Sequence, residues 1–193
     1  MRTRTKLGLA GAAVLALVGS FLLSAFVLRG FSARDEPSAV EAFVARRLRH
    51  LAVPVAAREV ESPITLNDDV LAEARAHFAD HCALCHGNDG RGDTPLGRNL
   101  YPRAPDMQAT DTQTLSDGEL FYIIENGVRL TGMPAWGESG SHDDEASWQL
   151  VHFIRHLPNL TREELAEMEE LNPRSPRELE GEERGVAAPP HRH

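Results

Sequence analysis

The chain has 193 residues, a length that favours one folded domain with appended segments, and only 6% of its residues are aromatic. Its net charge of −9 is unevenly distributed: residues 1–58 carry +6, residues 59–158 carry −11 and residues 159–193 carry −4. An acidic central region argues against nucleic acid as a partner and favours a protein partner attracted by charge.

A basic segment, residues 1–6, precedes an uncharged and mainly apolar run, residues 7–28. That run is long enough to cross a bilayer as one helix. Because the basic residues come before it, we expect the N-terminus in the cytoplasm and the rest of the chain on the far side. We predict an uncleaved anchor in the bacterial inner membrane, crossing it once, with the main domain in the periplasm. A cleaved signal peptide is the alternative, although residues 32–33 make a poor cleavage site.

Residues 29–66 are predicted to form a spacer helix and a linker. Ser38 and Glu41 have capping-box spacing and open a helix that ends near Leu51. Its apolar stripe contains Val40, Phe43, Val44, Leu48 and Leu51. We expect this helix to pack on the following domain, and the alternative is that it lies on a lipid surface. Residues 52–66 contain two prolines and little pattern, which is typical of a linker.

The next helix is predicted to begin at Asn67, where two acidic residues follow at its positively polarised end, and to stop at Gly87. Apolar residues and cysteines recur at steps of three and four along it: Leu71, Ala74, Phe78, Cys82 and Cys85. This spacing predicts that both cysteines face the core.

The only two cysteines of the chain lie in the string Cys82-Ala83-Leu84-Cys85-His86. A C-x-x-C-H string is typical of covalent haem c attachment. Each cysteine sulfur bonds one haem vinyl group, and the imidazole of His86 then lies within reach of the iron. The alternative is that Cys82 and Cys85 supply half of the ligands of a zinc site, but no further ligands occur at suitable spacing.

Residues 87–115 show no sustained helical or strand periodicity in their apolar residues. A segment of this length without regular structure is unusual in a compact domain unless it wraps a bound group. Ser116 and Glu119 then form a second capping box for a helix over 117–125, closed by Gly127. A last domain helix is predicted over 143–158. The tail, residues 159–193, is predicted to be acidic and helical to about Leu171, and disordered beyond it.

A haem iron held by His86 needs a sixth ligand or an open position. Met133 lies between Gly132 and Pro134, in a loop after a capped helix, and is the predicted thioether ligand. Met107 is the alternative. His81 is disfavoured because it adjoins Cys82 on the same helix.

These features resemble a class I (mitochondrial-type) cytochrome c over residues 67–158, and more closely the bacterial, membrane-attached monohaem type. Cys82, Cys85, His86 and Met133 match the attachment motif and ligands of that family. Further matches are Phe78 on the N-terminal helix, Ala74 where the family usually has glycine, and Phe153 and Leu157 on the C-terminal helix. The resemblance implies an all-α cytochrome c fold of about three to five helices around one covalent haem c.

The resemblance also implies further haem contacts. In the family, a proline carbonyl in the loop after the motif accepts a hydrogen bond from the proximal histidine, and Pro95 is the candidate, with Pro105 the alternative. The candidate partners for the haem propionates are Arg98, Tyr101, Arg103 and Trp136. A surface or packing role is the alternative for each of them.

Two axial ligands leave no open coordination position, which favours electron transfer over catalysis on a bound substrate. The sequence therefore predicts a membrane-anchored periplasmic cytochrome that carries single electrons between respiratory or photosynthetic redox proteins. The alternative is the haem-bearing subunit of a larger oxidase, reductase or dehydrogenase complex. A gas sensor is a third hypothesis and would require Met133 to dissociate.

Overall fold

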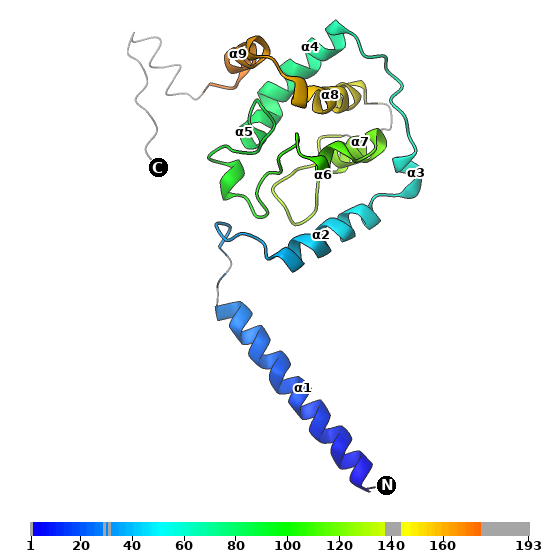
Figure 1. Ribbon diagram of the computed structural model, residues 1–193, viewed down its shortest axis with the longest axis vertical. Helices are drawn as coiled ribbons and strands as arrows, with labels where there is room; N and C mark the ends of the chain where they lie inside the picture. Colours follow the sequence, from blue (N-terminus) through cyan, green and yellow to red (C-terminus); the bar gives the residue numbers. More distant parts are fainter. Residues whose placement is uncertain (1, 29, 31, 138–143, 175–193) are drawn as a thin grey trace, which may run out of the picture. The chain divides into compact units, whose positions relative to one another are not determined.

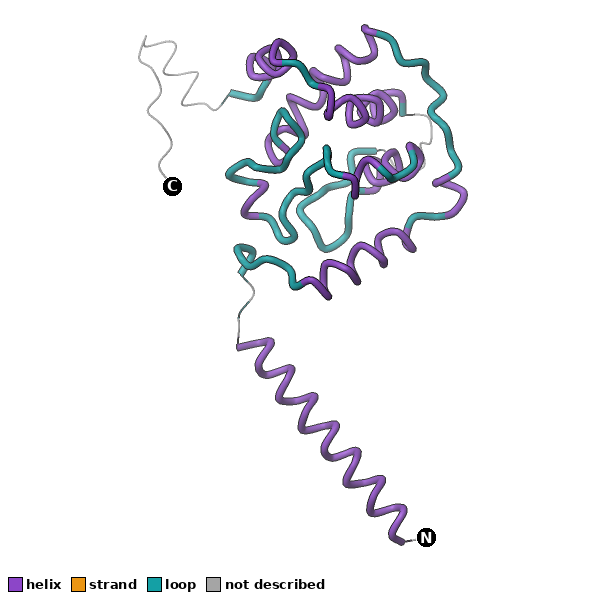
Figure 2. The backbone as a smooth tube through the Cα atoms, viewed as in Figure 1, coloured by secondary structure: helices purple, strands orange, loops and turns teal. Residues whose placement is uncertain are grey.

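The computed structural model describes residues 2–28, 30, 32–137 and 144–174 (Figure 1). The chain divides into two compact units, Met1–Asp35 and Glu36–His193. Every regular element in the described ranges is helical, and no strand occurs in them (Figure 2). The predicted all-α fold is confirmed.

The first unit is dominated by one helix, α1, Arg2–Leu28. Its stretch Gly11–Leu28 is long and apolar enough to cross a membrane, and none of that stretch is buried. A membrane anchor and a signal sequence share these properties.

The second unit contains eight further α-helices in its described part. These are α2 Ala39–Ala52, α3 Val55–Arg58, α4 Asp68–His77, α5 Ala83–His86, α6 Thr110–Gln113, α7 Asp117–Asn126, α8 Glu145–His156 and α9 Arg162–Leu171. A π-helix, Phe78–Cys82, joins α4 to α5, and short 3₁₀ turns lie at Gly97–Asn99 and Leu157–Asn159.

Most helix starts follow from local side-chain chemistry. In five helices the side-chain oxygen of the N-cap residue accepts a hydrogen bond from a backbone N–H of the first turn. These N-cap residues are Ser38, Asn67, Ser116, Asp144 and Thr161. The boxes at Ser116 and Thr161 are complete, because Glu119 and Glu164 bond back to the cap residues. The predicted helix starts are therefore close to the observed ones.

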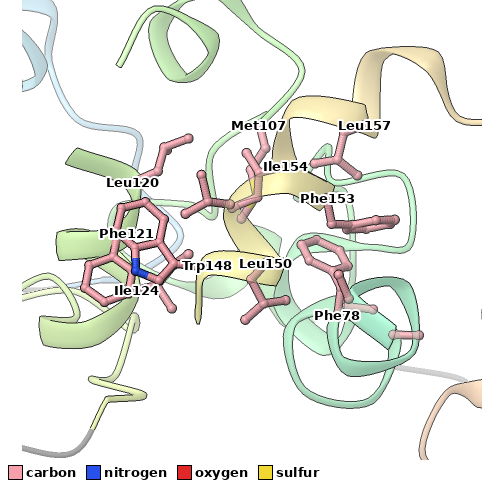
Figure 3. Packing of buried hydrophobic residues seen from close by; sticks show 14 of the residues in the cluster. Phe78, Met107, Leu120, Phe121, Ile124, Trp148, Leu150, Phe153, Ile154 and Leu157 are labelled. Atoms are coloured by element: carbon pink, nitrogen blue, oxygen red, sulfur yellow. The ribbon is translucent and has the colours of Figure 1, made fainter. Parts of the chain in front are cut away.

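The core lies between α4 and α8 at one end and between α7 and α8 at the other (Figure 3). Ala74 is fully buried, and its small side chain lets α4 approach α8 closely. The rings of Phe78 and Phe153 meet with centroids 5.0 Å apart, whereas Phe121 stacks on Trp148 at 4.2 Å. Phe153 on α8 therefore packs against Phe78, directly after α4, as predicted.

The segment predicted as a linker is partly packed. Val53 is buried, and α3 lies so close to α7 that a Cβ on Gly118 would lie 2.0 Å from the carbonyl oxygen of Ala57. The Ser116 hydroxyl also donates a hydrogen bond to the Arg58 carbonyl. Residues 53–58 therefore belong to the folded domain.

The helix α9 extends the core beyond the predicted domain limit at residue 158. Met168 is fully buried in the main hydrophobic cluster. Arg75 on α4 forms ion pairs with Glu164 at 3.1 Å and with Glu167 at 2.6 Å. The disorder predicted for the end of the tail falls mainly on residues 175–193, which lie outside the described residues. Residue Asp143, the predicted start of the last domain helix, also lies outside them.

Candidate functional site

The helix that carries the two cysteines and His86 contains a π turn, Phe78–Cys82, in which the N–H of Ala83 bonds to the carbonyl of Phe78, five residues earlier. The buried residues in this turn are Phe78 and Ala79, and those after it are Ala83 and His86.

The prediction that both cysteines face the core is therefore only half right. Cys82 packs partly against the hydrophobic cluster, but Cys85 does not belong to it. The extra residue in the π turn moves the buried face one position along the chain, from residues 82 and 85 to residues 83 and 86. As a result, His86 is buried and the two sulfurs lie beside the buried face.

Neither cysteine forms a disulfide. Burial raises the pKa of Cys82 to about 12, and the neighbouring Cys85 adds to the shift. Burial also raises the pKa of Cys85. Both cysteines are therefore free, protonated thiols at pH 7.

The imidazole of His86 is buried and neutral. Only 8% of the residue is exposed, and burial lowers its pKa to about 4, against an opposing effect from the backbone of Pro105. Its Nδ1 is buried without a hydrogen bond of normal geometry. A neutral buried imidazole keeps a ring-nitrogen lone pair that can bind a metal.

Of the two prolines predicted to accept from His86, Pro105 is the one whose backbone acts on the imidazole. The carbonyl of Pro95 instead accepts a hydrogen bond from the Asn99 side chain at 2.7 Å, at the surface. We therefore propose Pro105 rather than Pro95 for this role.

The loop after the motif is folded tightly back onto it. Gly87 ends α5 at φ 73°. The Thr94 hydroxyl donates to the carbonyl of Leu84 at 2.9 Å and accepts the N–H of Gly97 at 2.8 Å. A Cβ on Gly97 would lie 2.2 Å from the carbonyl oxygen of Cys85. Sequence reasoning did not identify Thr94 or Gly97, and only the glycine content of the loop hinted at such close packing.

The alternative ligand Met107 is a core residue. It is 8% exposed and packs in the hydrophobic cluster near Ile154 (Figure 3). The Gln113 amide donates to the backbone carbonyls of both residues, at 2.8 and 2.9 Å. Met107 is therefore fixed from both its side chain and its backbone.

Met133, in contrast, lies outside the hydrophobic cluster on a loop that folds back along the end of α7. It is partly exposed. Its N–H donates to the Thr131 hydroxyl at 3.1 Å, and its carbonyl accepts from the Val128 N–H at 3.1 Å. The N–H of Trp136 then bonds to the Ile124 carbonyl at 3.1 Å. The loop is thus fixed by its backbone, while the thioether is free of the core.

The four predicted propionate partners each contact another side chain. Arg98 pairs with Asp93 at 2.6 Å, and Arg103 pairs with Glu36 at 3.3 Å. The Tyr101 hydroxyl donates to Glu41, and the Trp136 ring meets the His81 ring edge to face at 5.4 Å. All four are exposed, so these contacts are surface interactions.

The described residues contain no group of three or more histidines, cysteines and carboxylates that would hold a metal ion. His152 bonds to Ser62 at 3.0 Å and His156 to Glu164 at 2.9 Å, so both have structural partners. His142 lies outside the described residues. Among the described residues, the zinc alternative for Cys82 and Cys85 therefore finds no set of further ligands.

The donor set fits a covalent haem: two free thiols, a buried neutral imidazole beside the Pro105 backbone, and a loop methionine outside the core. Residues 69–154 match the family model described as "Cytochrome C oxidase, cbb3-type, subunit III". Among solved structures, a chain of the "Kuenenia stuttgartiensis reducing HAO-like protein complex Kustc0457/Kustc0458" is 20% identical, with a TM-score of 0.42. That match covers 51% of this chain and 49% of the other, so it spans about half the length of each. Comparison with curated proteins finds no match.

Proposed function

We propose that the chain is a membrane-anchored monohaem cytochrome c carrying single electrons between redox proteins. The match of residues 69–154 to a cytochrome family model supports this proposal. The observation that carries it is the placement of His86, which is buried and neutral and follows two free thiols, while Met133 stands outside the core on a separate loop.

In this proposal Cys82 and Cys85 would hold a haem through two thioether bonds, and His86 and Met133 would bind its iron. The haem, when bound, would supply a one-electron iron couple. The π turn precedes His86, whose side chain is buried. With both side chains bound to the iron, the site would favour electron transfer over binding of a substrate.

The proposed location follows from α1 and the charges beside it. The apolar stretch Gly11–Leu28 supports an anchor, and the basic residues before it favour a cytoplasmic N-terminus. We therefore propose a single pass through the inner membrane of a bacterium, with the cytochrome domain in the periplasm. The net charge of −11 on residues 59–158 favours partners with a basic docking surface.

A second candidate is a subunit of a larger oxidoreductase complex. The description of the matched family names a subunit of an oxidase. The helices α2 and α9 both lie outside the matched residues, so the chain has structure that the domain by itself does not require.

The experiment that tests the proposal is purification of the full chain from native membranes in mild detergent. We expect one haem per chain, retained after acid–acetone extraction, and its loss in the double variant Cys82→Ser, Cys85→Ser. Haem that is extracted from the unmodified chain would contradict the covalent assignment. Purification as a single chain supports the carrier, whereas stoichiometric co-purification with other subunits supports the complex.

A further inference from the structure

The helix α2 is attached to its domain by polar side chains. Glu41 accepts a hydrogen bond from Tyr101, and Arg46 lies 4.0 Å from Asp111. His50 pairs with the buried Glu119 at 2.9 Å. The side of α2 that meets the domain is therefore its polar side.

The apolar side of α2 points away from the domain. At 100° per residue, its five large apolar side chains fall within an arc of about 140°, with Glu41 and His50 just beyond its two edges. Ala42 and Arg49, which are partly buried, lie on the other side of the helix. All are 46% exposed or more: Val40 74%, Phe43 54%, Val44 46%, Leu48 60% and Leu51 73%. A surface helix of a globular domain normally shows the reverse arrangement, with its apolar stripe inward. The helix contacts the domain as expected, but through these polar side chains and not through its apolar stripe.

The charges near this face favour an anionic lipid surface as its partner. Arg47 projects from within the apolar face, between Phe43 and Val40, with its guanidinium carbon 5.5 Å from the centre of the Phe43 ring. Residues 29–58 carry a net charge of +3, in contrast to −11 for residues 59–158. Aliphatic side chains beside arginines are typical of helices that lie in the headgroup region of a membrane.

The chain also keeps α2 near the bilayer that α1 is proposed to cross. Helix α1 ends at Leu28, and α2 begins at Ala39. The ten residues between them, fully extended, span at most about 35 Å. The apolar face of α2 is thus confined to the vicinity of the membrane surface.

We propose that α2 lies in the headgroup region on the side of the membrane where α1 ends, with its Val40–Leu51 face inserted among the lipids. This inference rests on the proposed membrane anchor. Since the polar side of α2 holds the cytochrome domain through Tyr101, Asp111 and Glu119, that domain is fixed in orientation against the bilayer.

Spin labelling of the full holoprotein in lipid nanodiscs containing one-third anionic lipid tests this contact. In the holoprotein Cys82 and Cys85 are thioethers, so a new cysteine is the one that reacts. Labels are placed by Leu48→Cys on α2, by Leu22→Cys in α1 and by Glu170→Cys, an exposed position on α9. Collision with oxygen reports lipid, and collision with a nickel chelate reports water. The haem absorption spectrum checks that each variant is folded.

We expect the label at position 48 to be about threefold less accessible to the nickel chelate than the label at position 170. Its depth should be about 5–10 Å, at the boundary between headgroups and acyl chains. If the Leu22 label is shielded but the Leu48 label is as accessible as Glu170, the lipid contact is overturned while the anchor stands. That result would indicate a protein as the occupant of this face. If the Leu22 and Leu48 labels are both accessible, the anchor and the lipid contact are overturned together.

Discussion

Gly127 and Met133 are packed backbone against backbone. Gly127 ends α7 at φ 62°, and a Cβ at this position would lie 2.7 Å from the carbonyl oxygen of Met133 and 2.5 Å from the carbonyl carbon of Pro134. The end of the helix thus positions the loop that carries the proposed thioether ligand.

We expect Gly127→Ala to displace the Met133 loop, because the added Cβ would collide with the loop backbone. The displacement should reduce the intensity of the sulfur-to-iron absorption band of the oxidised form. At φ 62° and ψ −169°, a conformation nearly confined to glycine, alanine costs about 1–3 kcal/mol. Gly90→Ala is the control, since Gly90 has φ 72° and its Cβ would meet the side chain of the buried Leu157 and no backbone atom. An equal loss of the band in both variants would show that backbone strain, not contact with Met133, is responsible.

Replacement of the two candidate methionines should separate ligation from packing. Met133→Ala should abolish the sulfur-to-iron band and lower the reduction potential, because a thioether ligand favours reduced iron. Met107→Ala should keep the band and lower the free energy of unfolding by about 2–5 kcal/mol, since Met107 is a core residue. Absorption spectra and urea unfolding provide both measurements, and loss of the band in Met107→Ala alone would reverse the assignment.

The Thr94 hydroxyl should stabilise the loop that follows the haem motif. Thr94→Val removes the donor to Leu84 and the acceptor of Gly97, so we expect a loss of about 1–3 kcal/mol in the free energy of unfolding. Thr114→Val is the control, because its hydroxyl donates to the Thr110 carbonyl in an exposed helix turn. Equal effects in urea unfolding would argue against a special role for Thr94.

The contact between α9 and α4 should weaken in acid. Burial opposes ionisation of Glu164, but hydrogen bonds from Thr161 and His156 outweigh it and lower the pKa of the carboxyl. A lowered pKa stabilises the folded state above the ordinary value of 4.5, and this stabilisation is lost as the pH falls through the lowered pKa.

We therefore expect Glu164→Gln to reduce the free energy of unfolding by about 1 kcal/mol at neutral pH, and by progressively less as the solution is acidified. Denaturant unfolding at a series of pH values measures this dependence. Glu170→Gln, an exposed change on the same helix, should have little effect at any pH. A constant difference between Glu164→Gln and the unmodified chain down to low pH would contradict the role of the Glu164 charge.

The parts of the fold that depend on neighbours in sequence were predictable. Ser116 with Glu119, and Thr161 with Glu164, have the spacing of a capping box, and each box forms as expected. Gly127 ends its helix for the local reason that glycine tolerates a positive φ. The haem motif was recognisable because its chemistry requires fixed spacing.

The parts that depend on distant contacts were not predictable. The apolar stripe of α2 suggested packing on the domain, but Tyr101 and Glu119, both distant in sequence, hold its polar side. Likewise, the burial of Met168 depends on the ion pairs of Arg75 with α9, which no local pattern indicates. Amphipathic spacing tells which residues share a face, but not what covers that face.

The π turn at Phe78–Cys82 makes the haem motif sensitive to the length of its helix. Each residue advances an α-helix by 100°, and the turn accommodates one residue more than a regular helix would. A regular helix of the same length would turn Cys82 and Cys85 to the buried side in place of Ala83 and His86. Deletion of Ala79 would remove the extra residue and leave Ala83 and His86 on the buried side. A helix exchanged from another cytochrome must therefore either carry the π turn or be one residue shorter.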